Sequence, residues 1–178
     1  KSVIMANGMS SAERKKLQAV VSRFQDRRLL VVGDLMLDQF IRGSVSRLSP
    51  EAPVPVVQVA QETFMPGGSG NVAQNLASLG AKVDLIGVVG DDAAARRLTG
   101  DFAAKGIGTD RILADPDRVT SLKCRVIADH QQVVRFDRET REKLSAKVEA
   151  ALLFRLDCAL ASAEALIELR ARGVVAKD

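Results

Sequence analysis

Hydrophobic and polar positions alternate between strand and helix periodicity along the 178-residue chain. Short apolar runs at 29–32 and 83–89 are typical of buried strands in a parallel sheet. Between them, Val72, Leu76 and Leu79 fall at i, i+4 and i+7, so the pattern predicts a helix with these residues on its inner face. We therefore expect an α/β fold, a mostly parallel sheet with helices on both faces.

Helix caps and apolar spacing predict further elements: Ser10 and Glu13 form a capping box, and Asp91 or Asp92 caps a helix with Leu98 and Phe102 on its inner face. We expect residues 1–27 to form a leader, disordered over 1–9, and a first helix, and residues 28–178 to form part of one α/β domain. The predicted helices span residues 10–24, 92–105, 140–153 and 162–172. Additional strands are predicted at 109–114 and 174–176.

Two segments differ in character from the rest of this fold. Residues 39–60 carry three prolines between positions 50 and 55, which prevent a helix, together with valines that favour strand. Residues 119–136 alternate on both sides of a turn at 129–130, which indicates a hairpin. We expect both segments to pair in one small sheet whose apolar face needs cover. The alternative is a proline-blunted edge strand without a ligand role.

Candidate ligand-binding residues cluster around a glycine turn. Gly67 and Gly68 lack a Cβ and let the main chain approach a ligand closely, and the Asn71 amide lies in the first turn of the next helix. Asp38 follows the first strand, and ligands bind at the carboxyl ends of parallel strands. We expect these four residues to line one pocket. The alternatives are a plain tight turn for the glycines and a helix or turn cap for Asp38.

Composition narrows the functional classes. With 47% hydrophobic and 27% charged residues the chain falls among soluble globular proteins, and its net charge of +4 fits a phosphorylated small molecule. The lack of Trp and Tyr argues against a nucleic-acid stacking platform, and no apolar run reaches membrane-spanning length. Two widely spaced cysteines indicate reduced thiols and a cytoplasmic protein. His130 is the sole histidine, so a catalytic histidine or zinc site is not expected.

Several motifs together resemble one enzyme family. The string GGSGNVA at 67–73, with glycines following at 80 and 90, resembles the first signature of the ribokinase-like (PfkB) carbohydrate kinases. The stretch VVGDLMLD at 31–38 resembles their opening strand. SRLSPEAPVPVV at 46–57 and HQQVVRFD at 130–137 are similar to one subgroup, the heptose 7-phosphate kinases. The resemblance covers residues 28–153 and degrades after that.

The resemblance implies an ATP-dependent kinase, with Mg²⁺ neutralising the phosphates, that phosphorylates the anomeric hydroxyl of D-glycero-D-manno-heptose 7-phosphate in ADP-heptose synthesis for lipopolysaccharide core. It assigns sugar binding to Asp38 and puts Gln131, Arg135 and Asp137 near the sugar phosphate. Arg135 has suitable chemistry because its planar guanidinium matches phosphate. The resemblance also implies that residues 39–60 and 119–136 belong to a small β lid inserted into the fold, which closes over the sugar and pairs two subunits into a homodimer.

The family's catalytic base is an Asp in a Gly-Ala-Gly-Asp turn, and the 178 residues contain no such turn. The Gly-Asp pairs at 33–34, 90–91 and 100–101 are not expected to form the amide-lined helix start that stabilises a transferring phosphate. We therefore assign no catalytic residue and no metal ligand. These residues are expected to bind sugar phosphate without consuming ATP.

Two other functions remain open at this point. The glycines of 68–73 satisfy G-x-G-x-x-A, and Asp91 follows the next strand, as in dinucleotide-binding domains. Against this, Met65, Pro66 and a polar loop are expected to separate the glycines from any preceding strand. The second alternative is a non-catalytic oligomerising or sugar-sensing fragment, because lid strands alone can pair between subunits.

Overall fold

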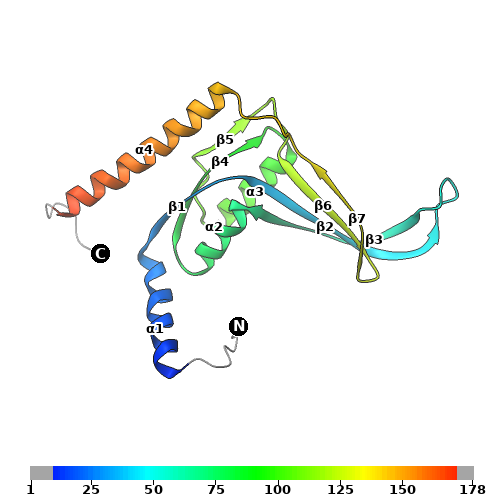
Figure 1. The fold of residues 1–178 in the computed structure, drawn as a ribbon, viewed down its shortest axis with the longest axis horizontal. Coiled ribbons are helices and arrows are strands. Elements are labelled where there is room, and N and C mark those ends of the chain that lie inside the picture. Colours follow the sequence, from blue (N-terminus) through cyan, green and yellow to red (C-terminus); the bar gives the residue numbers. More distant parts are fainter. Residues whose placement is uncertain (1–9, 172–178) are drawn as a thin grey trace.

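The computed structural model describes residues 10–171 (Figure 1). The expected leader at 1–9 and the expected strand at 174–176 lie outside the described residues. The elements in chain order are α1 (Ser11–Ser22), η1 (Arg23–Asp26), β1 (Arg28–Val32), β2 (Leu35–Leu48), β3 (Pro55–Gly68), α2 (Ser69–Ser78), β4 (Lys82–Gly90), α3 (Ala93–Ala104), β5 (Ile112–Asp115), β6 (Ser121–Ala128), β7 (Gln131–Arg138) and α4 (Ala146–Ala171).

A parallel sheet of strands β1-β4-β5 forms the base of the fold and confirms the predicted α/β class. Its middle strand β4 is mostly buried on both faces, which explains why Asp84 is the one charged residue between positions 83 and 89. Leu85 belongs to the core that includes Leu98 and Phe102 of α3. Ile86 lines a cavity on the opposite face together with Leu152 of α4. Helices therefore cover both faces of this sheet.

The lid is a second sheet with strand order β3-β2-β6-β7 that extends away from the base (Figure 1). Strand β2 pairs antiparallel with β3 and parallel with β6, so segments more than 80 residues apart lie side by side. This confirms the predicted pairing of 39–60 with 119–136. The turn at Asp129 and His130 is also confirmed, since both residues have positive φ angles.

The lid strands are longer than predicted. Strand β2 begins at Leu35, so Asp38 lies inside a strand rather than after a turn. Strand β3 runs to Gly68, so the prediction of a polar loop before the glycines was wrong. The strand that leads into the glycines is an antiparallel lid strand, whereas a dinucleotide fingerprint follows a parallel strand of a βαβ unit.

Helix α2 confirms the predicted inner face only in part, because Leu76 packs against the core as expected but Val72 and Leu79 do not. Its buried residues are Gly70 and Ala73, whereas Val72 and Leu79 are 49% and 41% exposed. A Cβ on Gly70 would lie 2.7 Å from the Phe102 ring, which shows how closely the helix backbone approaches α3. Small residues are needed at this contact, and the pattern of large apolar side chains did not reveal it.

The starts of helices α1 and α3 agree with the predictions made from the sequence. Ser10 and Glu13 form the predicted capping box of α1. Asp92 is the N-cap of α3, and the predicted inner residues Leu98 and Phe102 are fully buried. Strand β5 begins at Ile112, three residues later than predicted.

The last helix corrects another prediction. Residues 146–171 form the single helix α4, where separate helices over 140–153 and 162–172 were predicted. The intervening residues 154–161 contain no glycine or proline that would interrupt a helix. Among the described residues, no helix is both long enough and apolar enough to span a membrane.

Candidate functional site

Asp38 and the glycine turn meet because β2 and β3 are antiparallel neighbours. Met36 lies opposite Gly67, and Asp38 lies opposite Met65. A Cβ on Gly67 would clash with Oδ2 of Asp38 and lie 2.8 Å from Cγ of Met36. Gly67 is therefore required by the Asp38 carboxylate itself, in addition to any role in the turn.

The second glycine shapes the turn into α2. Gly68 has φ 55° and ψ −134°, a conformation that side chains strongly disfavour. Ser69 anchors this turn to the segment after β1, because its amide and its hydroxyl both donate to the Asp34 carbonyl, at 3.0 and 2.7 Å. Asn71 follows in the first turn of α2 with its side chain exposed to solvent. The predicted glycine turn thus lies beside Asp38, near the carboxyl end of β1.

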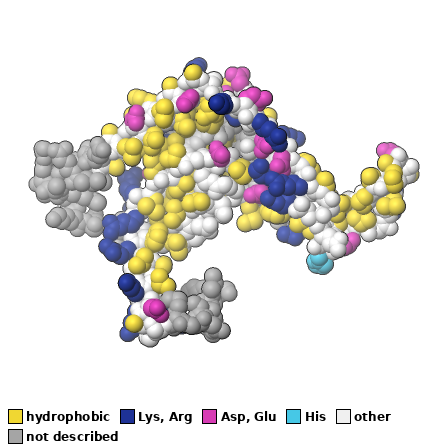
Figure 2. All heavy atoms as spheres, viewed as in Figure 1, with side chains coloured by type: hydrophobic (Ala, Val, Ile, Leu, Met, Phe, Trp, Pro, Cys, Tyr) yellow, Lys and Arg dark blue, Asp and Glu magenta, His cyan; other side chains and the backbone are white. Residues whose placement is uncertain are grey.

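One face of the lid carries two rows of mostly charged residues. Asp38, Lys123 and Asp137 lie in register across β2, β6 and β7. Two positions further along each strand, and hence on the same face, Phe40, Arg125 and Arg135 form the next row. Figure 2 shows basic and acidic side chains intermixed where the lid meets the central sheet.

The acidic and basic side chains of these rows are paired. Arg135 donates to both oxygens of Asp137, from Nε at 2.9 Å and from Nη2 at 2.8 Å. The Nζ of Lys123 lies 3.1 Å from Glu139 and 3.5 Å from Asp137. The Arg135 hydrogen bond holds the pKa of Asp137 below its usual range, and the Lys123 and Arg141 hydrogen bonds do the same for the pKa of Glu139. Both carboxylates are therefore charged at neutral pH.

Asp38 has a different partner. Its Oδ1 accepts a hydrogen bond from Nη1 of Arg125 at 2.5 Å. The guanidinium of Arg125 also lies 5.3 Å from the centre of the Phe40 ring. Arg125 was not among the predicted site residues, although strand alternation from Lys123 places it on the same face.

The structure brings six of the seven predicted residues into one region. Asp38, Gly67 and Gly68 adjoin one another, Asn71 follows in α2, and Arg135 and Asp137 lie across the lid. Gln131 lies elsewhere, opposite Ala128 at the hairpin tip. That position is five residues from Lys123 along β6, or about 16 Å at the usual rise of a strand.

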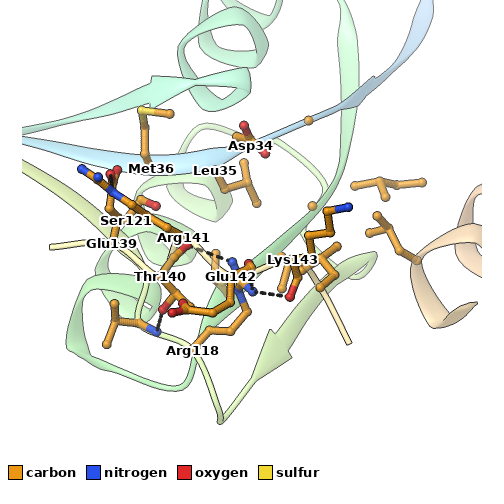
Figure 3. Close-up of a pocket in the computed structure, with 18 of the residues that line it drawn as sticks. Asp34, Leu35, Met36, Arg118, Ser121, Glu139, Thr140, Arg141, Glu142 and Lys143 are labelled. Atoms are coloured by element: carbon orange, nitrogen blue, oxygen red, sulfur yellow. Dashed lines mark hydrogen bonds and ion pairs between the residues drawn. The ribbon is translucent and has the colours of Figure 1, made fainter. Parts of the chain in front are cut away.

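A cavity of about 610 Å³ opens beside this charged face (Figure 3). The carboxyl ends of β1 and β4, the first residues of β2 and the segment 139–144 line it. It meets the lid at Met36, Lys123 and Glu139, and none of the seven predicted residues is part of its lining. The cavity and the charged lid face together form the candidate site.

Arg118 fixes one wall of the cavity. Its guanidinium donates to the carbonyl oxygens of Thr140 at 3.1 Å, Glu142 at 2.9 Å and Lys143 at 3.4 Å, as the dashed lines in Figure 3 show in part. The Thr140 hydroxyl accepts from the Val119 amide. Sequence reasoning missed Arg118 because its partners are main-chain atoms more than 20 residues away, which leave no side-chain pattern.

A second polar contact joins three elements behind the site. Asp92 accepts from the Ala95 amide with Oδ1 and from the Thr120 amide with Oδ2, both at 2.8 Å. The Thr120 hydroxyl accepts from the Gly90 amide at 2.9 Å. Burial raises the pKa of Asp92, but the hydrogen bonds from Thr120 and Ala95 outweigh it and leave the pKa below its usual value. Asp92 and Thr120 together tie the end of β4 and the start of α3 to the entry of β6.

These features define a class of protein. A parallel sheet whose strand ends open into a polar cavity beneath a charged lid is typical of enzymes that bind small polar molecules. The family model described as pfkB family carbohydrate kinase matches residues 26–168. The chain belongs to the pfkB family of carbohydrate kinases.

Curated relatives include two proteins named "Bifunctional protein HldE". The one from Pelobacter propionicus is 49% identical over 137 residues, which are 77% of this chain and 28% of the relative. The one from Campylobacter curvus is 52% identical over 121 residues, or 68% of this chain and 26% of the relative. The chain thus spans roughly a quarter of the length of these relatives.

Solved structures share the fold. A putative ribokinase from Agrobacterium tumefaciens matches with a TM-score of 0.51 and 24% identity, over 71% of this chain and 42% of that one. Arabidopsis thaliana ribokinase, complexed with ribose and ATP, matches with a TM-score of 0.51 and 16% identity, over 62% and 35% of the two chains. The ribokinase-like fold predicted from the sequence is confirmed.

Proposed function

We propose that this chain forms the sugar-binding part of a heptose 7-phosphate kinase. The proposed substrate is D-glycero-D-manno-heptose 7-phosphate, and the reaction transfers the γ-phosphoryl group of ATP to its anomeric hydroxyl, in ADP-heptose synthesis for lipopolysaccharide core. Family membership and the HldE relatives support a sugar kinase. We also propose that the protein acts in the cytoplasm.

The single observation that carries this proposal is the position of the Asp38 carboxylate. Arg125 occupies Oδ1, while Oδ2 adjoins the bare main chain of Gly67. Sugar hydroxyls donate well to such a carboxylate oxygen, and charge-assisted hydrogen bonds of this kind are short and strong. The absence of a Cβ at Gly67 also lets a sugar ring approach the turn.

Lys123 and Arg135 suit the 7-phosphate. Arg135 uses Nε and Nη2 for Asp137, and a guanidinium has five N–H donors in all. Donors therefore remain on Arg135 for a phosphate oxygen while Asp137 keeps the guanidinium in place. Lys123 lies on the same face between Asp38 and Asp137, and its ammonium adds a second positive charge.

The donor half of the reaction has no residues assigned here. ATP and Mg²⁺ belong to the proposed reaction, yet the described residues contain no group of three His, Cys, Asp or Glu suited to a metal. The Gly-Ala-Gly-Asp turn is also missing from the 178 residues. We propose that these residues bind sugar phosphate and do not turn over ATP, because transfer needs a base within reach of the attacking hydroxyl.

Isothermal titration calorimetry with heptose 7-phosphate tests the proposal. We expect the wild type to bind and Asp38→Asn to bind at least about tenfold more weakly, because a hydrogen bond to a charged group contributes about 1.5–3 kcal/mol. Asp110→Asn is the matched control, since that residue is exposed in the turn before β5. Binding within twofold of wild type is expected for it. A wild type that gives no binding heat contradicts the proposal.

We further propose that the lids of two subunits pair. Val59, Val134 and Phe136 are 56%, 48% and 49% exposed, and a lid face with such side chains favours a second apolar surface. Hydrophobic side chains also line the outer end of β2 and β3 in Figure 2. Sedimentation should give a dimer, and Phe136→Asp should give a monomer. Assembly without sugar-phosphate binding would instead favour a non-catalytic oligomerising fragment.

A further inference from the structure

Arg125 occupies the centre of the charged lid face without an assigned role. It lies on β6 between Phe40 of β2 and Arg135 of β7. Its side chain is 26% exposed and that of Asp38 is 20% exposed, so the ion pair between them is largely shielded from solvent. A shielded pair of this kind is screened less by salt than a surface pair.

The position is unfavourable for an arginine by strand pairing alone. Arg125 lies directly opposite Arg135, and like charges in such a pair destabilise a sheet. Two contacts offset this repulsion on the Arg125 side, the hydrogen bond to Asp38 and the stacking on Phe40. The guanidinium is thereby held in one orientation.

The same contacts define the orientation of Asp38. Arg125 fixes Oδ1, and Oδ2 lies against Gly67, so neither oxygen is free to rotate without losing a contact. An unpaired carboxylate on a strand samples several rotamers, and ordering it on ligand binding costs affinity. A carboxylate that is already ordered avoids that cost.

We propose that Arg125 is a positioning residue that holds the Asp38 carboxylate ready for sugar hydroxyls. The inference rests on the proposed sugar site. Arg125 acts through Asp38, so its removal weakens sugar binding only while Asp38 is present. This property distinguishes positioning from direct contact with the ligand. An Arg125 side chain that contacts the ligand directly would still contribute to binding in an Asp38 variant.

The test is a double-mutant cycle read by calorimetry with heptose 7-phosphate. The variants are Arg125→Met, Asp38→Asn and their combination, with thermal unfolding recorded for each. We expect Arg125→Met to weaken binding about tenfold, and the double variant to bind no more weakly than Asp38→Asn alone. Arg125→Gln, which keeps a polar side chain but is shorter and uncharged, is expected to match Arg125→Met and serves if the methionine variant does not fold.

Arg42→Met is the matched control. Arg42 lies on the same strand face as Asp38, and its guanidinium lies 5.8 Å from the same Phe40 ring. Binding within twofold of wild type is expected for this variant. If Arg125→Met and Arg125→Gln bind like wild type, or if the losses add in the double variant, positioning is refuted while the sugar site stands. If the wild type itself does not bind, the proposed function and the inference fail together.

Discussion

Replacing Gly67 with alanine tests the contact between the glycine turn and the candidate sugar ligand. Gly67 is buried and lies outside the set of positive-φ glycines, so its backbone can accommodate alanine. The new methyl group, however, would overlap Oδ2 of Asp38 and lie 2.8 Å from Cγ of Met36. The carboxylate has to move, and its hydrogen bond from Arg125 is lost or lengthened.

The expected magnitude combines two effects. Overpacking of a filled site typically costs about 1–3 kcal/mol. Loss of the partly shielded Asp38–Arg125 pair adds about 1 kcal/mol. We therefore expect Gly67→Ala to lower the free energy of unfolding by about 2–4 kcal/mol. It should also weaken heptose 7-phosphate binding at least about tenfold, since 1.4 kcal/mol corresponds to a factor of ten.

Gly100→Ala provides the matched control. Gly100 lies inside α3, and a Cβ there would meet nothing within 4 Å. Alanine should raise the free energy of unfolding by about 0.5–1 kcal/mol because it favours the helix. Urea unfolding followed by circular dichroism, together with calorimetry, measures both variants. If Gly67→Ala is as stable as Gly100→Ala and binds like wild type, the inferred contact with Asp38 is wrong.

Other predictions concern the supports of the site. Arg118→Met should lower the urea midpoint by the equivalent of about 1–3 kcal/mol, because three carbonyl oxygens of the segment 140–143 lose their donor. Arg141 has a side chain that is 84% exposed, so Arg141→Met should change the midpoint little. Asp92→Asn should cost about 1–2 kcal/mol, because an NH2 group replaces one of the two oxygens that accept from Ala95 and Thr120. Equal stability in the two proteins would contradict this. The pKa of Asp92 is lowered, so its stabilisation is present above the unfolded-state pKa of about 3.9 and is lost as pH falls through the lower folded-state value. Urea titrations should therefore show wild type and Asp92→Asn converging below about pH 4.

Features set by local sequence were predictable. The buried run at 83–89, the capping box at Ser10 and the cap at Asp92 each depend on a few neighbouring residues, and all three occur in the structure. The pairing of the two lid segments was also predicted, because both resemble parts of one kinase lid. Local patterns did not reveal the length of β2. The residues after β1 were expected to form a turn at a ligand site, so their strand alternation was not recognised.

Features set by register were harder to predict. Arg125 meets Asp38 only because β6 aligns with β2 in one parallel register, over a separation of 87 residues. Arg118 binds main-chain oxygens, which any sequence offers. The inner face of α2 was predicted from its large apolar residues, whereas close packing against Phe102 selects Gly70. Tertiary contacts of this kind cannot be predicted from the spacing of apolar residues along the chain.

A crystal structure of this chain with heptose 7-phosphate tests the location of the sugar site most directly. We predict the sugar on the charged lid face, with hydroxyls donating to Oδ2 of Asp38 beside Gly67 and the phosphate at Lys123 and Arg135. Sugar bound only in the deep part of the cavity, between β1 and the segment 139–144 and without contact to Asp38, would contradict the proposed site.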